Sequence, residues 1–254
     1  RAGAETLLIE RMGFLGGTLT AVTLGGLCGA FRHVGPEQEL RPVIGGLWDE
    51  LRDRLLAAEA LGPPRRSAMV RGVHGLPYDA ERLKRVLDEL LAAHGARVLT
   101  GCAVSAVTVE DGTIRAVVVE TVAGRAAILP RMVVDASGDA EVVARAGGGS
   151  HVAPGETLQS PSAMFAMAPV DLPAFAATPR PEVNRLLEAS GLPLPRTMIA
   201  AFATLADGHV HLNATRVRRP DGTAFDTTDP WDRAAAEAEG RRQVALYEAA
   251  TRAA

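Results

Sequence analysis

The sequence predicts an α/β fold, in which a parallel sheet is joined by a three-stranded antiparallel β-meander and followed by a partial α+β domain. Three patterns support this. The short apolar run at residues 7–9 suits a strand buried on both faces of a parallel sheet. Residues 83–91 carry an apolar stripe at helical spacing, and residues 103–129 hold β-prone runs separated by short turns.

The first strand leads into a stretch that predicts a nucleotide-binding edge. Glu10 follows the apolar run directly, and in dinucleotide-binding sheets an acid at this end of the second strand binds the ribose hydroxyls. A glycine pair then allows close approach of the backbone to a phosphate or ring, and two threonines supply small donors beside it. These residues are Gly16, Gly17, Thr18 and Thr20.

A strand that carries a ribose-binding acid is normally preceded by roughly 20 residues with a first strand and a G-x-G-x-x-G turn. Here only residues 1–4 and Glu5 precede the strand region, and no initiator Met is present. We therefore expect a segment of a longer protein, without its amino-terminal glycine loop. The uncapped helix that runs to Ala254 suggests the same at the other end.

Composition limits the possible functions. The 254 residues suffice for one large or two modest domains, and the formal net charge of −3 gives no reason to expect nucleic-acid binding. No apolar run approaches the roughly 20 residues that span a bilayer, so we expect a cytoplasmic protein without a membrane segment. Cys28 and Cys102 lie far apart and supply neither a disulfide framework nor a set of metal ligands.

Several elements follow along the chain. Apolar residues at helical spacing predict a helix from about residue 37 that ends at Gly62, and residues 65–77 indicate a loop or weak strand. Asp79 is expected to cap a second helix, which closes at His94 and Gly95. A short strand at 97–100 comes next. The meander strands are expected at 103–109, 114–122 and 125–129.

A second strand, turn and helix is predicted after the meander. The apolar run at 132–135 indicates a strand, and a helix is expected at 140–146. The turn between them places backbone N–H groups and a small hydroxyl at a helix start, where a cofactor phosphate or ribose can be held. Its residues are Ala136, Ser137, Gly138 and Asp139.

Prolines become frequent beyond residue 149, which predicts a domain boundary. We expect a first domain at residues 1–149, incomplete at its amino terminus, and a second at 150–254, incomplete at its carboxyl terminus. The second contains strand candidates at 162–167 and 210–214 and a helix at 182–190. Asp229 followed by proline predicts the start of a long final helix.

Catalytic residues are harder to identify. Arg32 and His33 are weak candidates for an acid or an anion clamp, with an ordinary loop pair as the alternative. His209 and His211 lie at strand spacing, but without a nearby acid they make a poor metal site. No metal is therefore expected. The arginines at 216, 218 and 219 indicate a solvated loop face.

Together these patterns resemble the FAD-dependent oxidoreductases of the glutathione-reductase-like fold, whose FAD-binding sheet is Rossmann-like, and in particular the relatives of heterodisulfide reductase. The resemblance rests on L-L-I-E-R-x-G-F-L-G-G-x-x-T at 7–20, the helix and hairpin after residue 78, V-V-D-A-S-G-D-A-E-V at 133–142, and N-A-T-R from Asn213. It covers nearly the whole chain.

The resemblance implies roles for particular residues. Glu10 would bind the adenosine ribose of FAD, the glycine pair would lie by the phosphates, and the loop at Val104 would meet the adenine through its backbone. The turn at 136–139 would close the site. The cofactor-binding set that follows is Glu10, Arg11, Gly16, Gly17, Thr18, Thr20, Val104, Ala136, Ser137, Gly138 and Asp139.

Two features of the family are missing from the sequence: the amino-terminal glycine loop and the late Gly-Asp segment that binds the other end of FAD. Some relatives also bind a 4Fe-4S cluster through cysteine motifs that this sequence does not contain.

The resemblance implies an enzyme that uses FAD to transfer a hydride or two electrons from a small organic substrate to an acceptor, which the sequence does not identify. One alternative is a non-catalytic or electron-transfer FAD-fold component of a larger complex, possibly one with iron-sulfur clusters. A second, an NAD-binding dehydrogenase, is weakened because the meander is a trait of the FAD fold.

Overall fold

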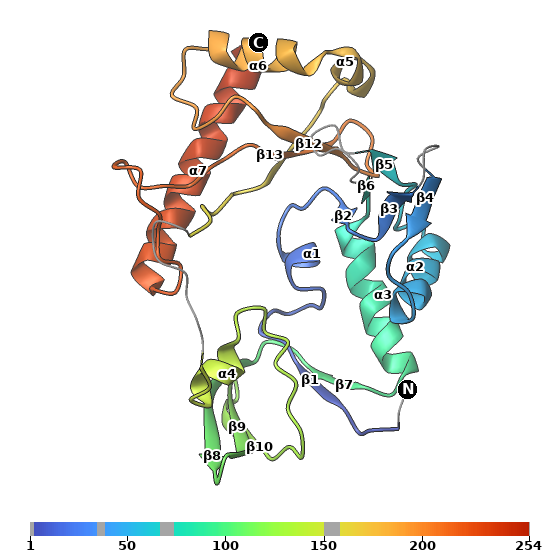
Figure 1. Cartoon of the computed structure of the whole chain (residues 1–254), viewed down its shortest axis with the longest axis vertical. Coiled ribbons are helices and arrows are strands. Elements are labelled where there is room, and N and C mark those ends of the chain that lie inside the picture. The colour runs from blue at the N-terminus through green and yellow to red at the C-terminus, as the bar shows by residue number, and fades with distance from the viewer. Residues whose placement is uncertain (1–2, 35–38, 67–73, 150–157, 254) are drawn as a thin grey trace. The chain divides into compact units, whose positions relative to one another are not determined.

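The computed structural model describes residues 3–34, 39–66, 74–149 and 158–253, which form a mixed α/β structure (Figure 1). The chain divides into two compact units that alternate along the sequence. Unit 1 combines Arg1–Leu15 with Leu87–Ala153, and unit 2 combines Gly16–Val86 with Pro154–Ala254. The division into domains at residues 149 and 150 stays a prediction.

Unit 1 contains the parallel pair that the sequence predicts. Strand β1 (Leu7–Ile9) pairs in parallel with β7 (Arg97–Leu99), with Leu8 opposite Val98. The backbone of Glu10 continues this pairing, because its N–H donates to the Leu99 carbonyl (2.9 Å) and its carbonyl accepts from the Cys102 N–H (3.1 Å). The position of Glu10 at the end of β1 is therefore fixed by main-chain hydrogen bonds.

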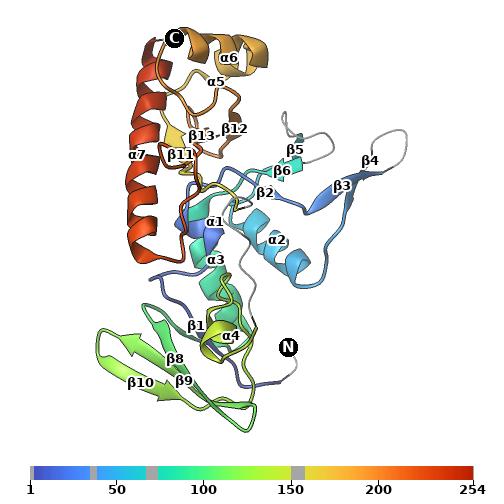
Figure 2. The same cartoon turned by 60° about the vertical axis from the view of Figure 1, so that its left-hand side comes forward.

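A three-stranded antiparallel sheet in the order β10-β9-β8 follows in unit 1 (Figure 2). Val117 and Val119 of the middle strand are buried. The short helix α4 comes after the sheet in the chain. The bounds are β8 (Ala103–Glu110), β9 (Thr113–Thr121), β10 (Gly124–Ile128) and α4 (Glu141–Arg145).

The strand predicted at 132–135 is wrong. These residues form no strand, and the side chains of Met132 and Val134 are 83% and 84% exposed. A short apolar run becomes a strand only where a neighbouring strand accepts its hydrogen bonds, and no described strand pairs with this one. The carboxylate of Asp135 instead bonds to the backbone of α4.

The first part of unit 2 consists of short elements. Two small antiparallel sheets, in the orders β2-β6-β5 and β3-β4, accompany helices α1, α2 and α3, the last of which continues into unit 1. The bounds are α1 (Thr18–Ala21), β2 (Leu27–Cys28), β3 (Phe31–Val34), β4 (Glu39–Pro42), α2 (Leu47–Ala57), β5 (Arg65–Arg66), β6 (His74–Leu76) and α3 (Ala80–Ala93).

The helix predicted from about residue 37 is wrong over its first part. Residues 39–42 form strand β4, and the helix begins only at Leu47. Pro42 explains the difference, since proline lacks an N–H and clashes with the preceding turn inside a helix. Part of the residue 65–77 stretch, 67–73, lies outside the described residues.

Local end signals place α3 correctly. The Asp79 carboxylate accepts hydrogen bonds from the N–H groups of Glu81 (2.9 Å) and Arg82 (3.0 Å). Gly95 follows the helix with a φ of 68°, the left-handed conformation that ends many helices. The predicted helix with its cap at Asp79 is confirmed.

The second part of unit 2 packs helices on an antiparallel sheet in the order β11-β13-β12 (Figure 1). The helix expected from Asp229 is confirmed, because the carboxylate of this residue accepts from the N–H groups of Trp231 and Asp232. The bounds are β11 (Phe165–Met167), α5 (Leu172–Ala177), α6 (Arg180–Ala189), β12 (Ala200–Ala203), β13 (Val210–Asn213) and α7 (Pro230–Ala253).

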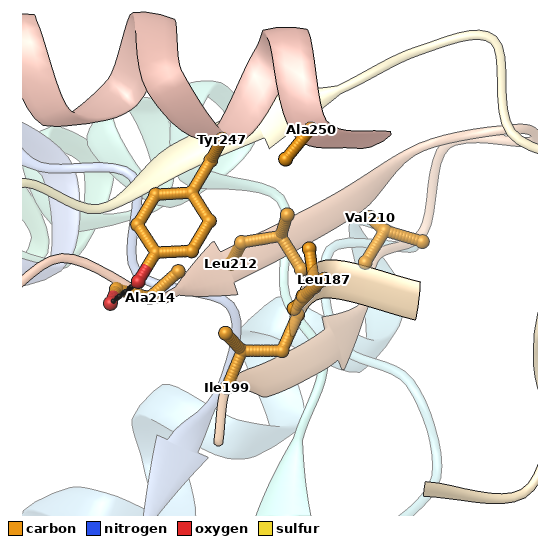
Figure 3. Packing of buried hydrophobic residues seen from close by; sticks show 7 residues of the cluster. All are labelled: Leu187, Ile199, Val210, Leu212, Ala214, Tyr247 and Ala250. Atoms are coloured by element: carbon orange, nitrogen blue, oxygen red, sulfur yellow. Dashed lines mark hydrogen bonds between the residues drawn. The ribbon is translucent and has the colours of Figure 1, made fainter. Parts of the chain in front are cut away.

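The core of this part lies between α7, α6 and the sheet. Figure 3 shows the ring of Tyr247 beside the end of β13, with its hydroxyl directed at Ala214. The buried members of the cluster are Leu187, Ile199, Val210, Leu212, Ala214, Tyr247 and Ala250.

Candidate functional site

Glu10 has the geometry expected of a ligand-binding acid. Its residue is half-buried at the end of β1, and one carboxylate oxygen accepts a hydrogen bond from the Met12 N–H at 2.7 Å. Within the described residues, the other oxygen accepts no hydrogen bond. The carboxylate is therefore oriented by its own loop and keeps an oxygen for a hydroxyl donor such as ribose.

Arg11 connects the two predicted cofactor-binding segments of unit 1. Its guanidinium lies 3.1 Å from the Glu141 carboxylate and 3.9 Å from that of Asp139. Arg11 and Asp139 are both largely exposed, so these ion pairs contribute at most about 1 kcal/mol each. They nevertheless place the loop after β1 beside the turn at 136–139, as the prediction of one shared site requires.

The turn before α4 is organised by Asp135, a residue that the sequence analysis did not select. Its carboxylate accepts from the N–H groups of Ser137, Val142 and Val143, all at 3.0 Å. The hydroxyl of Ser137 accepts from the Glu141 N–H at 2.9 Å. The first amides of α4 are thus satisfied within the chain, which leaves the exposed residues Gly138 and Asp139 as the outer surface of the turn.

This hydrogen bonding has a consequence for stability at low pH. Hydrogen bonds from Ser137 and from the α4 backbone lower the pKa of Asp135 from 3.8 to about 2. A carboxyl group with a depressed pKa stabilises the folded state fully above pH 3.8 and loses that contribution as the pH falls toward 2. The acid in V-V-D-A-S-G-D could have been identified from its position just ahead of a predicted helix.

We expect Asp135→Ala to lower the free energy of unfolding by about 0.5 to 2 kcal/mol at neutral pH, the usual cost of removing a capping side chain. Urea denaturation of both proteins at a series of pH values measures the difference. It should shrink as the pH falls below 3.8. A difference that stays constant over that range would show that the ionised carboxylate is not what stabilises the turn.

Gly16 and Gly17 are required by the local backbone. Their φ angles are 111° and 52°, a range that favours glycine, and a Cβ on Gly16 would come within 2.5 Å of the Thr20 side chain. Thr20 is buried, with its hydroxyl 3.4 Å from the Gly17 carbonyl, whereas Thr18 is exposed at the start of α1. Gly17 and Thr18 are thus the members of this segment that are open to a ligand.

The remaining predicted residues lie on strands. Val104 is half-buried in β8, next to an irregularity in the pairing with β9. Arg32 and His33 occupy β3, opposite Arg41 and Leu40 of β4, and Arg32 is exposed. The weak catalytic candidates therefore belong to a β-hairpin rather than to a loop, and a catalytic role for them stays a prediction.

The two histidines of the second part differ in their surroundings. His209 is exposed just before β13, whereas His211 within β13 has a buried Nδ1 without a hydrogen-bond partner among the described residues. Burial lowers the pKa of His211, which favours the neutral imidazole. No group of three or more potential metal ligands occurs in the described part of the chain.

Comparison with known proteins identifies the family. The sequence profile described as "FAD dependent oxidoreductase" matches residues 1–254. This chain belongs to the FAD dependent oxidoreductase family. The resemblance stated from the motifs is thereby confirmed. No curated protein sequence matches the chain.

Solved structures similar to this family member were also found. CabE, an aromatic hydroxylase from angucycline biosynthesis, is 18% identical with a TM-score of 0.48, over 85% of this chain and 40% of CabE. BexE, studied for oxidation during BE-7585A biosynthesis, is 17% identical with a TM-score of 0.46, over 93% of this chain and 44% of BexE. THI4 from Thermovibrio ammonificans is 20% identical with a TM-score of 0.36, over 56% of this chain and 52% of THI4.

The chain thus spans about half, or less, of the length of these structures. Membership of the FAD dependent oxidoreductase family directs attention to FAD, and the residues of unit 1 fit its ribose end. Glu10 presents a free acceptor oxygen at a strand end, and the adjacent Arg11 pairs with Asp139 of the exposed turn. None of the helices in the described ranges is long and apolar enough to cross a membrane.

Proposed function

We propose that this chain is part of an FAD-dependent oxidoreductase that transfers a hydride or two electrons from a small organic substrate to an acceptor. The observation that carries the proposal is the match to the FAD dependent oxidoreductase family over residues 1–254. When bound, FAD supplies the redox chemistry, and the protein supplies binding, orientation and electrostatics.

The residues would divide this work between them. Glu10 accepts hydrogen bonds from the adenosine ribose, and its charge disfavours a 2′-phosphate at that position. Arg11 keeps the turn at 136–139 beside Glu10 through its ion pairs with Asp139 and Glu141. Gly17 and Thr18 present an uncovered backbone and a hydroxyl to the phosphates, and Val104 presents its backbone to the adenine.

The formal net charge of −3 supports a small-molecule substrate over a nucleic-acid one. We retain the predictions of a cytoplasmic protein and of an unidentified electron acceptor. A 4Fe-4S cluster normally needs four cysteine ligands, and the sequence contains two cysteines, one of which, Cys102, is buried. Any cluster would therefore need ligands from outside this sequence.

Anaerobic reduction of the purified protein at its natural length tests the redox part of the proposal. With FAD bound, a panel of small alcohols, amines and hydroxy acids is added in the absence of oxygen, and the flavin absorbance is followed. Bleaching by one member, with its oxidised product recovered in equal amount, would support a substrate oxidoreductase. Bleaching only by a reduced protein partner would instead support an electron-transfer component.

A further inference from the structure

A cavity of about 430 Å³ lies in unit 2, between the segment after β13 and helix α7. Four arginines line it, and three of them come from consecutive or alternate positions that the sequence analysis assigned to a solvated loop face. The charged and amide side chains of the lining are Arg216, Arg218, Arg219, Glu239, Arg242 and Gln243. None belongs to the residues predicted to bind FAD.

The backbone beneath these arginines is held in place by a buried side chain. Gln243 of α7 is 4% exposed, and its amide accepts from the Arg216 N–H (2.9 Å) and donates to the Arg216 carbonyl (3.1 Å). Its nitrogen also donates to the Glu239 carboxylate. The segment after β13 is therefore fixed to α7, so a ligand that bound here would not have to order it.

The arginines differ in how their charges are compensated. Arg242 pairs with Glu239 through two hydrogen bonds of 2.7 Å, and Arg219 pairs with Asp232 while its guanidinium lies 4.9 Å from the centre of the Phe225 ring. Both groups therefore have a carboxylate partner.

Arg218 and Arg216 have no carboxylate partner among the described residues. The Arg218 guanidinium donates to neutral oxygens, the Ser160 hydroxyl at 2.8 Å and the Gly222 carbonyl at 2.7 Å. The exposed Arg216 guanidinium makes no hydrogen bond or ion pair with any described residue. Four guanidinium charges thus face two carboxylates, which leaves two positive charges at the cavity.

We propose that this cavity binds a small molecule with two neighbouring anionic groups, either a dicarboxylate or a diphosphate. The planar fork of arginine matches carboxylate and phosphate oxygens in pairs, and Arg218 is already oriented by its neutral partners. Two anionic groups would balance the two uncompensated charges. Pro193 and Pro195 complete the wall and restrict the backbone opposite the arginines.

Isothermal titration calorimetry of the FAD-saturated protein with inorganic pyrophosphate, and separately with succinate, tests this proposal at low ionic strength. We expect at least one anion to bind, and the tighter of the two identifies the class. Arg216→Ala should weaken binding by about tenfold or more, the effect of losing one hydrogen-bonded charge. Because this side chain makes no described contact, its removal should not affect folding.

Arg241→Ala is the matched control, since Arg241 lies next to Arg242 on α7 but pairs with Glu237 and does not line the cavity. Its affinity should equal that of the unaltered protein. The proposal is overturned if neither anion binds, or if Arg241→Ala weakens binding as much as Arg216→Ala. It is also overturned if binding occurs only without FAD, because the anion then occupies the flavin phosphate site.

Discussion

Replacing Tyr247 with alanine should lower the free energy of unfolding by about 3 to 5 kcal/mol, the usual cost of removing a buried aromatic ring. The side chain is completely buried and packs beside the Phe165 ring, with 6.1 Å between the ring centres. Its hydroxyl also lies 2.6 Å from the carbonyls of Arg196 and Ala214. Urea denaturation followed by circular dichroism measures the loss.

Two further variants separate the contributions of Tyr247. Tyr247→Phe keeps the ring and should cost about 1 to 3 kcal/mol, the effect of leaving buried polar groups unpaired. Trp231→Ala removes an aromatic side chain that is 83% exposed at the start of α7, and should change stability by no more than about 0.5 kcal/mol. Equal denaturation midpoints for Tyr247→Ala and Trp231→Ala would contradict the core described here.

Glu10→Ala should weaken FAD binding by about one to two decades in the protein at its natural length. The change removes hydrogen bonds between a charged carboxylate and the ribose, and such bonds are worth roughly 1.5 to 3 kcal/mol. Fluorescence titration of the apoprotein with FAD measures the dissociation constant.

The controls for this change come from the same strand region. Glu10→Gln keeps an oxygen that can accept from the Met12 N–H, so it should preserve the loop and yet weaken FAD binding through the lost charge. Glu5→Ala removes an exposed acid ahead of β1, 3.9 Å from Arg97, and should bind FAD normally. Unchanged affinity in Glu10→Ala would show that the ribose lies elsewhere.

The sequence predicted best those features that are decided by neighbouring residues. The caps at Asp79 and Asp229 and the glycine after α3 act within a few residues, so their positions could be recognised in advance. The strand at residues 7–9 was also found, because its apolar run pairs with β7 and leads directly to the acid.

Features that depend on distant partners were missed. The run at 132–135 has strand composition but no described strand beside it, and the hairpin of β3 and β4 replaced the start of a predicted helix around Pro42. The capping role of Asp135 and the compensation of Arg219 by Asp232 both depend on the folded arrangement of side chains. Sequence spacing indicated the residue types but not these pairings.

The most direct test of the account is to identify the cofactor that the protein carries at its natural length. The purified protein is denatured, and the released compound is separated by chromatography and compared with FAD and NAD standards. We predict a yellow protein that releases FAD in about equal molar amount. A colourless protein that neither releases FAD nor takes it up when added, or one that releases NAD, would contradict the proposed function.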